Sequence, residues 1–251
     1  MTDELLSLRV LVVSGSQTGP DLFRRAASAS KVPTEIVEAD DATSAIHSIA
    51  LGLDLAFLDV ELGSETIAQV TIAARAAPKP PFTVLLCAPG AIPAFQTDAL
   101  ATKPSAPEEA VRLLEASIRV RLPCRVMVVD DSSTQRRIVS KILAATRFPL
   151  EVTEVEKGGD AVELASRKEF DIVFLDHNMP GFTGLETIFE FRRRAKKQMT
   201  CVLMTSTKDQ KLIMRARAQG ATFLKKPFFP EDIEGVLCRF YGLRALNSRR
   251  A

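Results

Sequence analysis

The sequence is poor in the residues that build zinc-bound or disulfide-linked proteins. It holds four cysteines, two histidines and no tryptophan in 251 residues. Cys87, Cys124, Cys201 and Cys238 lie far apart and form no C-x-x-C pair. This excludes the usual spacings of a zinc site, and two histidines cannot complete one. We therefore expect reduced thiols and no structural zinc.

Long hydrophobic runs are also missing. No apolar run approaches the roughly 20 residues that a membrane-spanning helix needs, and the first residues lack the pattern of a secretory signal. We therefore expect a cytoplasmic protein without membrane insertion. Because 251 residues exceed one ordinary α/β unit, we also expect two domains.

Charge is balanced over the chain but not between its halves. Residues 1–123 hold 10 basic and 15 acidic residues, whereas residues 124–251 hold 23 and 16. The halves could attract each other, or the basic half could bind an acidic partner. The densest basic cluster is Arg192-Arg193-Arg194 with Lys196-Lys197. No aromatic interleaving or DNA-reading motif accompanies it, so we interpret it as a solvated helix end and expect no nucleic-acid partner.

Short apolar runs alternate with helical patterns in the second half. Residues 125–129, 171–175, 201–204 and 221–224 have the length and composition of buried parallel strands. Polar residues follow or end these runs: Asp130 and Asp131, Asp176, Thr205 and Lys226. Ligands of such sheets bind beyond the carboxyl ends of the strands. The pattern predicts a phosphate-handling site in an α/β fold.

Three carboxylates that converge within a few ångströms repel each other, by about 4 kcal/mol per pair at 4 Å and an effective dielectric of 20. A hard divalent cation relieves this repulsion, and oxygen ligands beside a phosphate indicate Mg²⁺. We therefore expect Mg²⁺ as the cofactor.

The chain repeats itself. Residues 9–13 match residues 125–129, and residues 55–59 match residues 172–176, at offsets of 116 and 117 residues. The first copy departs from the second at the expected site: Ser14 and Gly15 replace the acidic pair, Asp59 and Lys103 remain, and Cys87 replaces the threonine. With one carboxylate of three left, the need for a cation disappears.

Together these motifs resemble a response-regulator receiver domain, of the kind phosphorylated by histidine kinases. The resemblance covers essentially the whole second half and rests on Asp130-Asp131, Asp176-His177-Asn178-Met179-Pro180 with Gly184, Met204-Thr205-Ser206 and Lys226-Pro227-Phe228. It implies two flavodoxin-like (βα)5 receiver domains in tandem, with parallel five-stranded sheets of order 2-1-3-4-5. We expect a degenerate receiver over residues 1–122, a phosphoacceptor receiver over residues 123–244 and a basic tail over residues 245–251.

The resemblance also implies roles for single residues. Asp176 is the phosphoacceptor, Thr205 and Lys226 contact the phosphoryl group, and Thr205 and Phe223 form the switch. Asp130, Asp131, Asp176 and the backbone carbonyl of Asn178 bind Mg²⁺. The implied partners are a histidine kinase or histidine phosphotransfer protein and a downstream protein target.

The first copy has a short interval before its lysine. Cys87 and Lys103 are 16 residues apart, against 21 between Thr205 and Lys226, and the interval contains Pro89 and Pro93. This predicts that the fourth helix is short or missing. The apolar sheet surface that it would cover is then expected to contact the other domain, a second subunit or another protein. A helix with a capping box is expected from Ser105 to about Arg121.

Three functions remain open. The preferred one is a two-component response regulator whose phosphorylation switches protein contacts, acting as a phosphoacceptor rather than a turnover enzyme, with a homodimer as the commonest assembly of such a chain. The second is a phosphorylation-independent adaptor, or the receiver input part of a longer output protein. The third is a hydrolase that discharges an aspartyl phosphate rapidly onto water, which lacks an obvious base.

Overall fold

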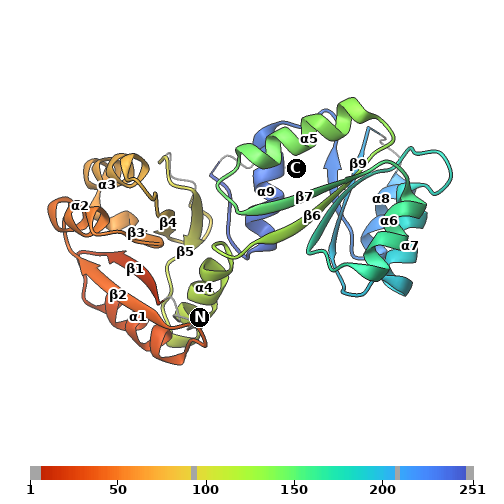
Figure 1. Cartoon of the computed structure of the whole chain (residues 1–251). Coiled ribbons are helices and arrows are strands. Elements are labelled where there is room, and N and C mark those ends of the chain that lie inside the picture. Colours follow the sequence, from red (N-terminus) through yellow and green to blue (C-terminus); the bar gives the residue numbers. More distant parts are fainter. Residues whose placement is uncertain (1–6, 92–94, 207–209, 247–251) are drawn as a thin grey trace, which may run out of the picture. The chain divides into compact units, whose positions relative to one another are not determined.

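The computed structural model describes residues 7–91, 95–206 and 210–246, and the chain divides into two compact units (Figure 1). The first unit contains Met1–Arg121 together with Leu237–Ala251, and the second contains Leu122–Val236. The first boundary between the units lies between Arg121 and Leu122. The second boundary lies within the last helix, between Val236 and Leu237.

The first unit is a parallel sheet of order β2-β1-β3-β4-β5 with helices on both faces (Figure 1). Helix α1 packs against α4, and α2 packs against α3. The elements are β1 (Leu8–Val13), α1 (Thr18–Ala29), β2 (Thr34–Ala39), α2 (Ala42–Ala50), β3 (Leu55–Asp59), the 3₁₀ turn η1 (Val60–Leu62), α3 (Ser64–Ala76), β4 (Phe82–Cys87), β5 (Ala99–Thr102) and α4 (Pro107–Arg119).

The second unit repeats this topology, with strand order β10-β9-β8-β6-β7. Figure 1 shows α5 and α9 on one face of this sheet and α6, α7 and α8 on the other. The elements are β6 (Cys124–Val129), α5 (Ser133–Ala145), β7 (Leu150–Val155), α6 (Gly158–Arg167), β8 (Ile172–Asp176), α7 (Gly184–Arg194), β9 (Thr200–Thr205), α8 (Gln210–Ala218), β10 (Thr222–Lys225) and α9 (Pro230–Phe240). Two flavodoxin-like sheets in tandem confirm the predicted fold class.

The central strands form because their residues are apolar on both faces. Every residue of β3, β4 and β8 is buried, as a parallel sheet between two helical layers requires. The repeat extends to the start of the sheet: the Arg9 amide donates to Asp54 Oδ2 at 3.0 Å, and the Arg125 amide donates to Asp171 Oδ2 at 2.9 Å. The two copies therefore share local contacts as well as sequence.

The copies differ between their fourth and fifth strands. In the second unit α8 fills this interval, whereas the described residues between β4 and β5 form no helix in the first. The side chains of Phe95 and Leu246 pack there against the core cluster that contains Leu85 and Leu100. Part of the sheet surface that the sequence leaves uncovered is therefore covered by residues of the same unit.

The helix expected from Ser105 to about Arg121 needs two adjustments. Helix α4 ends at Arg119, and its N-cap residue Ala106 makes no side-chain cap. Glu109 supplies the contact instead, because its Oε2 accepts from the amide and the hydroxyl of Ser105 at 2.8 and 2.9 Å. In the part of the chain that the structure describes, no helix combines the length and hydropathy needed to cross a membrane.

Candidate functional site

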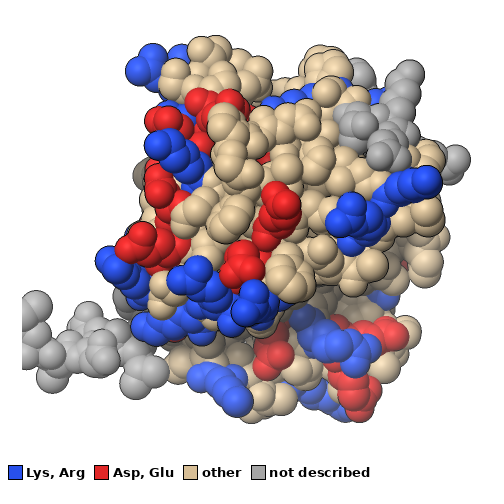
Figure 2. All heavy atoms as spheres, turned by 90° about the vertical axis from the view of Figure 1, so that its right-hand side faces the viewer, with Lys and Arg blue, Asp and Glu red and all other residues tan. Residues whose placement is uncertain are grey.

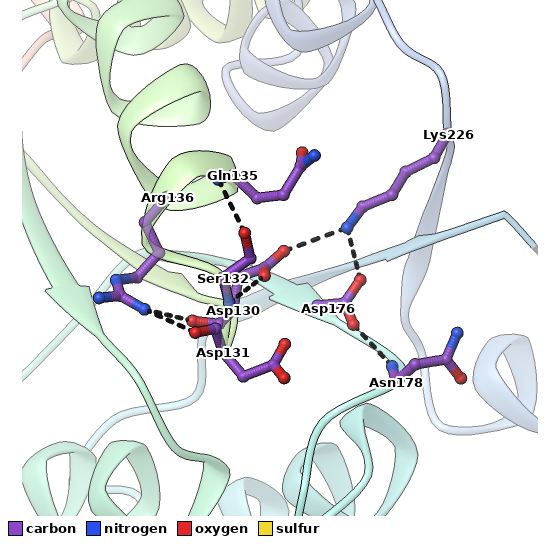
Figure 3. A network of polar contacts seen from close by, with 8 residues as sticks. All are labelled: Asp130, Asp131, Ser132, Gln135, Arg136, Asp176, Asn178 and Lys226. Atoms are coloured by element: carbon purple, nitrogen blue, oxygen red, sulfur yellow. Dashed lines mark hydrogen bonds and ion pairs between the residues drawn. The ribbon is translucent and has the colours of Figure 1, made fainter.

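The ammonium group of Lys226 contacts two buried carboxylates at the edge of the second sheet where the parallel strands end (Figure 3). Lys226 Nζ lies 2.6 Å from Asp176 Oδ1 and 3.1 Å from Asp130 Oδ2. Asp176 ends β8, Asp130 follows β6, and Lys226 follows β10, so three parallel strands deliver the group to one place. The two aspartate side chains are 9% and 3% exposed. The sequence-predicted convergence of these residues is present.

Backbone donors hold the remaining oxygens of the two carboxylates. The Asn178 amide donates to Asp176 Oδ2 at 2.7 Å, and the Ser132 amide donates to Asp130 Oδ1 at 2.9 Å. Each donor lies two residues beyond its acceptor, which is the spacing of an Asx turn. The carboxylates are thus oriented by the chain that leaves each strand.

Arg136 belongs to this group, although sequence reasoning did not single it out. Its Nη1 donates to the backbone carbonyl of Asp130 at 2.7 Å, and to that of Asp131 at 3.4 Å. Ser132 caps α5 through the Gln135 amide (Figure 3). A serine followed within one helical turn by an arginine, directly after an acidic pair, was the available signal. These residues fix the loop that presents Asp130 and Asp131.

Gly184 sets how closely α7 approaches the end of β8. A Cβ atom at this position would lie 2.4 Å from the backbone oxygen of Asp176 and 2.9 Å from the Cα of His177. The Gly184 amide donates to the His177 carbonyl at 3.0 Å. Only glycine fits this approach without moving the backbone of the site.

The other predicted site residues surround this group at different depths. Thr205 ends β9, is 1% exposed, and its carbonyl accepts from the Lys226 amide at 2.8 Å. Asp131 is exposed, and its carboxylate points away from Lys226 in Figure 3. Phe223 is half-buried and packs against the core cluster of the second unit. The structure therefore brings Asp130, Asp176 and Lys226 together. Thr205 is joined to this group through the backbone of Lys226, and Phe223 packs in the core.

The charge of Lys226 is favoured by its partners. Burial opposes the charged form, but the carboxylates of Asp176 and Asp130 outweigh it and raise the pKa of Lys226 above its ordinary value. The ammonium therefore stays protonated through the physiological range. One positive charge between two buried carboxylates leaves the three groups with a net charge of about −1, which a further cation can neutralise.

The donor set suits a hard cation. Carboxylate and carbonyl oxygens are the ligands that Mg²⁺ takes, commonly from one or two carboxylates with water completing its shell. Within the described residues, no three acidic, histidine or cysteine side chains stand together as a ready metal site. The exposed Asp131 and the shared Lys226 account for this, because one carboxylate points outward and the other two face an ammonium.

The corresponding place in the first unit is closed by protein contacts. Asp59 is 2% exposed at its side chain, and its Oδ2 lies 2.8 Å from Lys103 Nζ and 3.0 Å from Ser14 Oγ. Its Oδ1 accepts from the Glu61 amide at 3.1 Å. Lys103 also contacts Glu61 Oε2 at 2.7 Å, a partner that sequence reasoning missed.

The other residues of the first site differ in charge and burial. Burial opposes the charged form of Lys103, but Asp59 and Glu61 outweigh it and raise the pKa of Lys103. Cys87 is fully buried, and Gly15 is exposed, with no atom within 4 Å of the place that a Cβ atom would take. A single buried carboxylate is thus matched by one ammonium, one hydroxyl and one amide.

The basic cluster at the end of α7 is largely engaged within the second unit. Arg192 donates to the Gln219 carbonyl at 3.1 Å, Arg193 contacts Glu190 at 3.0 Å, and Lys197 contacts Asp171 at 2.8 Å. On the face drawn in Figure 2, basic and acidic side chains are interspersed with uncharged surface. Most of this cluster therefore serves contacts at the helix end.

Comparison with known families matches this geometry. The family described as "Response regulator receiver domain" matches residues 126–237. The rice protein "Two-component response regulator ORR11" (Oryza sativa subsp. japonica) is 35% identical over 120 residues, which cover 47% of this chain and 80% of the relative. The "Nitrate/nitrite response regulator protein NarP" of Escherichia coli (strain K12) is 32% identical over 128 residues, covering 51% of this chain and 60% of NarP.

A likeness in fold extends over both units. A solved structure described as "Structure of probable two-component system response regulator/GGDEF domain protein" covers 94% of this chain and is itself covered to 98%, with a TM-score of 0.61 and 22% identity. At this identity the likeness concerns the fold alone. It agrees with two flavodoxin-like units in one chain.

Proposed function

The chain belongs to the response regulator receiver family of two-component signalling, and from this premise we propose that Asp176 accepts the phosphoryl group of a phosphohistidine. The observation that carries the proposal is the placement of Asp176 and Asp130 around Lys226 Nζ, at 2.6 and 3.1 Å. Receiver domains interact with histidine kinases or histidine phosphotransfer proteins, and one of these is the donor.

The chemistry is an in-line displacement at phosphorus. A carboxylate oxygen of Asp176 forms the new O–P bond, the N–P bond of the phosphohistidine breaks, and the imidazole keeps the electron pair. Lys226 neutralises charge on the phosphoryl oxygens, and the Asn178 amide orients the carboxylate. Asp176 becomes a mixed anhydride until water hydrolyses it to the free carboxylate and phosphate, and we take the protein to be a phosphoacceptor rather than a turnover enzyme.

Mg²⁺ is the cation that receiver domains bind at this place, and the residues here fit it. Asp130, Asp131, Asp176 and the carbonyl of Asn178 would hold it. When bound, it neutralises the anionic oxygens of the incoming phosphoryl group. Because Asp130 and Asp176 contact Lys226, their carboxylates would be shared between the ammonium and the cation.

Thr205 and Phe223 form the switch. The Thr205 hydroxyl lies at the end of β9, from which it can donate to a phosphoryl oxygen on Asp176 and draw its loop inward. The half-buried Phe223 lies three residues before Lys226 and can follow that movement into the core cluster that it already contacts. Phosphorylation then shifts the population between two loop arrangements.

The first unit supports regulation or interaction rather than phosphotransfer. Its Asp59 is satisfied by Lys103, Ser14 and the Glu61 amide, and a second acidic residue is missing from the place of Asp130. Output passes through contacts with a downstream protein in the cytoplasm, without nucleic acid or membrane insertion. A homodimer is the assembly that we include in this proposal, since two-fold dimers are the commonest.

The test compares one substitution in each unit. The chain is incubated with acetyl phosphate and Mg²⁺, and its intact mass is measured. Asp176→Asn should abolish the added phosphoryl group, because the nucleophilic oxygen pair is lost. Asp59→Asn is the matched control at the equivalent strand end, and it should label like the unchanged chain.

A chelator should remove labelling in both the unchanged chain and the control. Labelling that persists in Asp176→Asn would refute the assignment of the acceptor. Labelling lost in Asp59→Asn, with the fold intact by circular dichroism, would mean that the first unit takes part in the chemistry. Absence of labelling in the unchanged chain itself would favour a phosphorylation-independent adaptor.

A further inference from the structure

The C-terminal segment adds a strand-like contact to the edge of the first sheet. We call residues 243–246 the 243–246 segment. Leu100 and Arg244 form an antiparallel bridge, in which each amide donates to the other carbonyl at 2.8 Å. Leu100 belongs to β5, which is the edge strand of that sheet. The segment therefore satisfies backbone groups that an edge strand leaves open.

The side chain of Arg244 reaches the end of the neighbouring strand. Its Nη2 lies 3.0 Å from Cys87 Sγ, and its Nη1 donates to the Ala91 carbonyl at 3.3 Å. Cys87 ends β4 and is fully buried, at the place where the second unit has Thr205. Arg244, near the C-terminal end of the sequence, thus contacts the residue that stands in the first unit where the second has Thr205.

Apolar residues on both sides of Arg244 are also covered. Leu243 is 3% exposed, and Leu246 packs with Phe95 against the core cluster that includes Leu85 and Leu100. This is the interval in which the described residues of the first unit form no helix, although the second unit has α8 there. The segment takes over part of the covering role that α8 has in the second unit.

Charge favours the same pairing. Residues 1–121 hold 10 basic and 15 acidic residues, whereas residues 237–251 hold four arginines and no acidic residue. Opposite net charges on residues 1–121 and on the C-terminal residues 237–251 raise the rate and specificity of their encounter, and salt screens this attraction. Backbone pairing, a guanidinium contact, apolar packing and charge therefore point to one occupant.

We propose that the first unit is a recognition module for a short extended segment of the pattern apolar-Arg-x-apolar, and that its resident ligand is the 243–246 segment of this chain. The β5 edge hydrogen-bonds the backbone of the segment, and Cys87 and the Ala91 carbonyl contact the arginine. The second apolar residue packs beside Phe95. This gives the degenerate receiver a binding function at the β5 edge, beside the interval between β4 and β5.

The binding is reversible rather than a fixed part of the core. Among the described residues, the buried Nε of Arg244 has no hydrogen-bond partner, so the guanidinium is incompletely satisfied. The Leu100 bridge, the guanidinium contacts of Arg244, the buried Leu243 and the half-buried Leu246 are the contacts that hold the segment. Its occupancy therefore depends on the high effective concentration that attachment to the same chain provides.

The test adds the segment from outside. A fluorescein-labelled peptide of residues 242–247 is titrated by fluorescence anisotropy into the full chain and into a full-length Arg244→Ala, Leu246→Ser variant. The variant weakens the contacts of its own segment and frees the β5 edge, so it should bind the peptide at least about tenfold more tightly than the unchanged chain. A peptide with alanine in place of arginine should bind neither chain.

Arg239→Ala is the matched control, because it removes one arginine from the exposed surface of the same C-terminal region. It should bind the peptide as weakly as the unchanged chain. Hydrogen exchange supplies a second measurement: the Leu100 amide should be protected in the unchanged chain and exchange faster in Arg244→Pro. Equal peptide affinity of all chains, or an unprotected Leu100 amide in the unchanged chain, would overturn the proposal.

Discussion

Replacing Lys226 by alanine leaves two buried carboxylates facing each other without their shared cation. Because Lys226 Nζ lies 2.6 Å from Asp176 Oδ1 and 3.1 Å from Asp130 Oδ2, these oxygens are at most about 5.7 Å apart. At an effective dielectric of 20, two unit charges at this separation repel by about 3 kcal/mol. This agrees with the low end of the cost of breaking a buried ion pair, as expected for an ammonium whose side chain is 22% exposed.

We therefore expect Lys226→Ala to lower the free energy of unfolding of the second unit by about 3 kcal/mol when a chelator is present. Mg²⁺ should restore much of this loss, since a divalent ion can take the place of the ammonium between the same carboxylates. Native-state hydrogen exchange at the amides of β8 measures the second unit separately from the first, which matters because two units need not unfold in one step.

Lys103→Ala is the matched control in the first unit. Asp59 keeps the Ser14 hydroxyl and the Glu61 amide and faces no second buried carboxylate. Exchange at the amides of β3 should therefore report a loss that Mg²⁺ does not restore. If Mg²⁺ restored the stability of both variants equally, or of neither, the electrostatic argument for a cation site in the second unit alone would be refuted.

Two further predictions concern the frame of the second unit. Gly184→Ala should destabilise this unit by about 2–3 kcal/mol, because the new Cβ atom would lie 2.4 Å from the backbone oxygen of Asp176. Gly159→Ala should be neutral or slightly stabilising, because its new Cβ atom would have no atom within 4 Å. The midpoints of urea unfolding compare the two variants. Burial raises the pKa of Asp171, but Lys197 and the Arg125 amide outweigh it and hold the pKa below its ordinary value. A group whose pKa is lower in the folded than in the unfolded state stabilises the folded protein at pH values above its unfolded-state pKa. This stabilisation is lost as the pH falls through the folded-state pKa. Asp171→Asn should therefore cost about 1 kcal/mol at pH 7 and progressively less below about pH 4; an unchanged cost down to pH 2 would contradict this.

Much of the second unit could be predicted because its determinants are local. Apolar runs of strand length marked the buried strands, and the residues directly after them were polar, so the sheet topology brings Asp130, Asp176 and Lys226 to one edge. The position of each residue in its strand was sufficient. The closure of the first site was also visible in part, because Asp59 and Lys103 kept their strand ends while the acidic pair was lost.

The remaining features depend on contacts that no local pattern encodes. Glu61 joins Lys103 because the 3₁₀ turn η1 carries it there, and Arg136 reaches the carbonyl of Asp130 from within α5. The pairing of Arg244 with Leu100 joins positions far apart in the sequence. The residues after α9 read as a basic tail because their apolar members, including Leu246, are too few to form a periodic pattern.

The most direct test of the phosphoacceptor assignment is to locate the phosphoryl group in the unchanged chain. The protein is labelled with acetyl phosphate and Mg²⁺, the acyl phosphate is reduced with borohydride, and the modified residue is identified by peptide mass spectrometry. The account predicts one modified residue, Asp176, and no modification when a chelator is present. Modification of Asp59, or an adduct that forms without Mg²⁺, would contradict it.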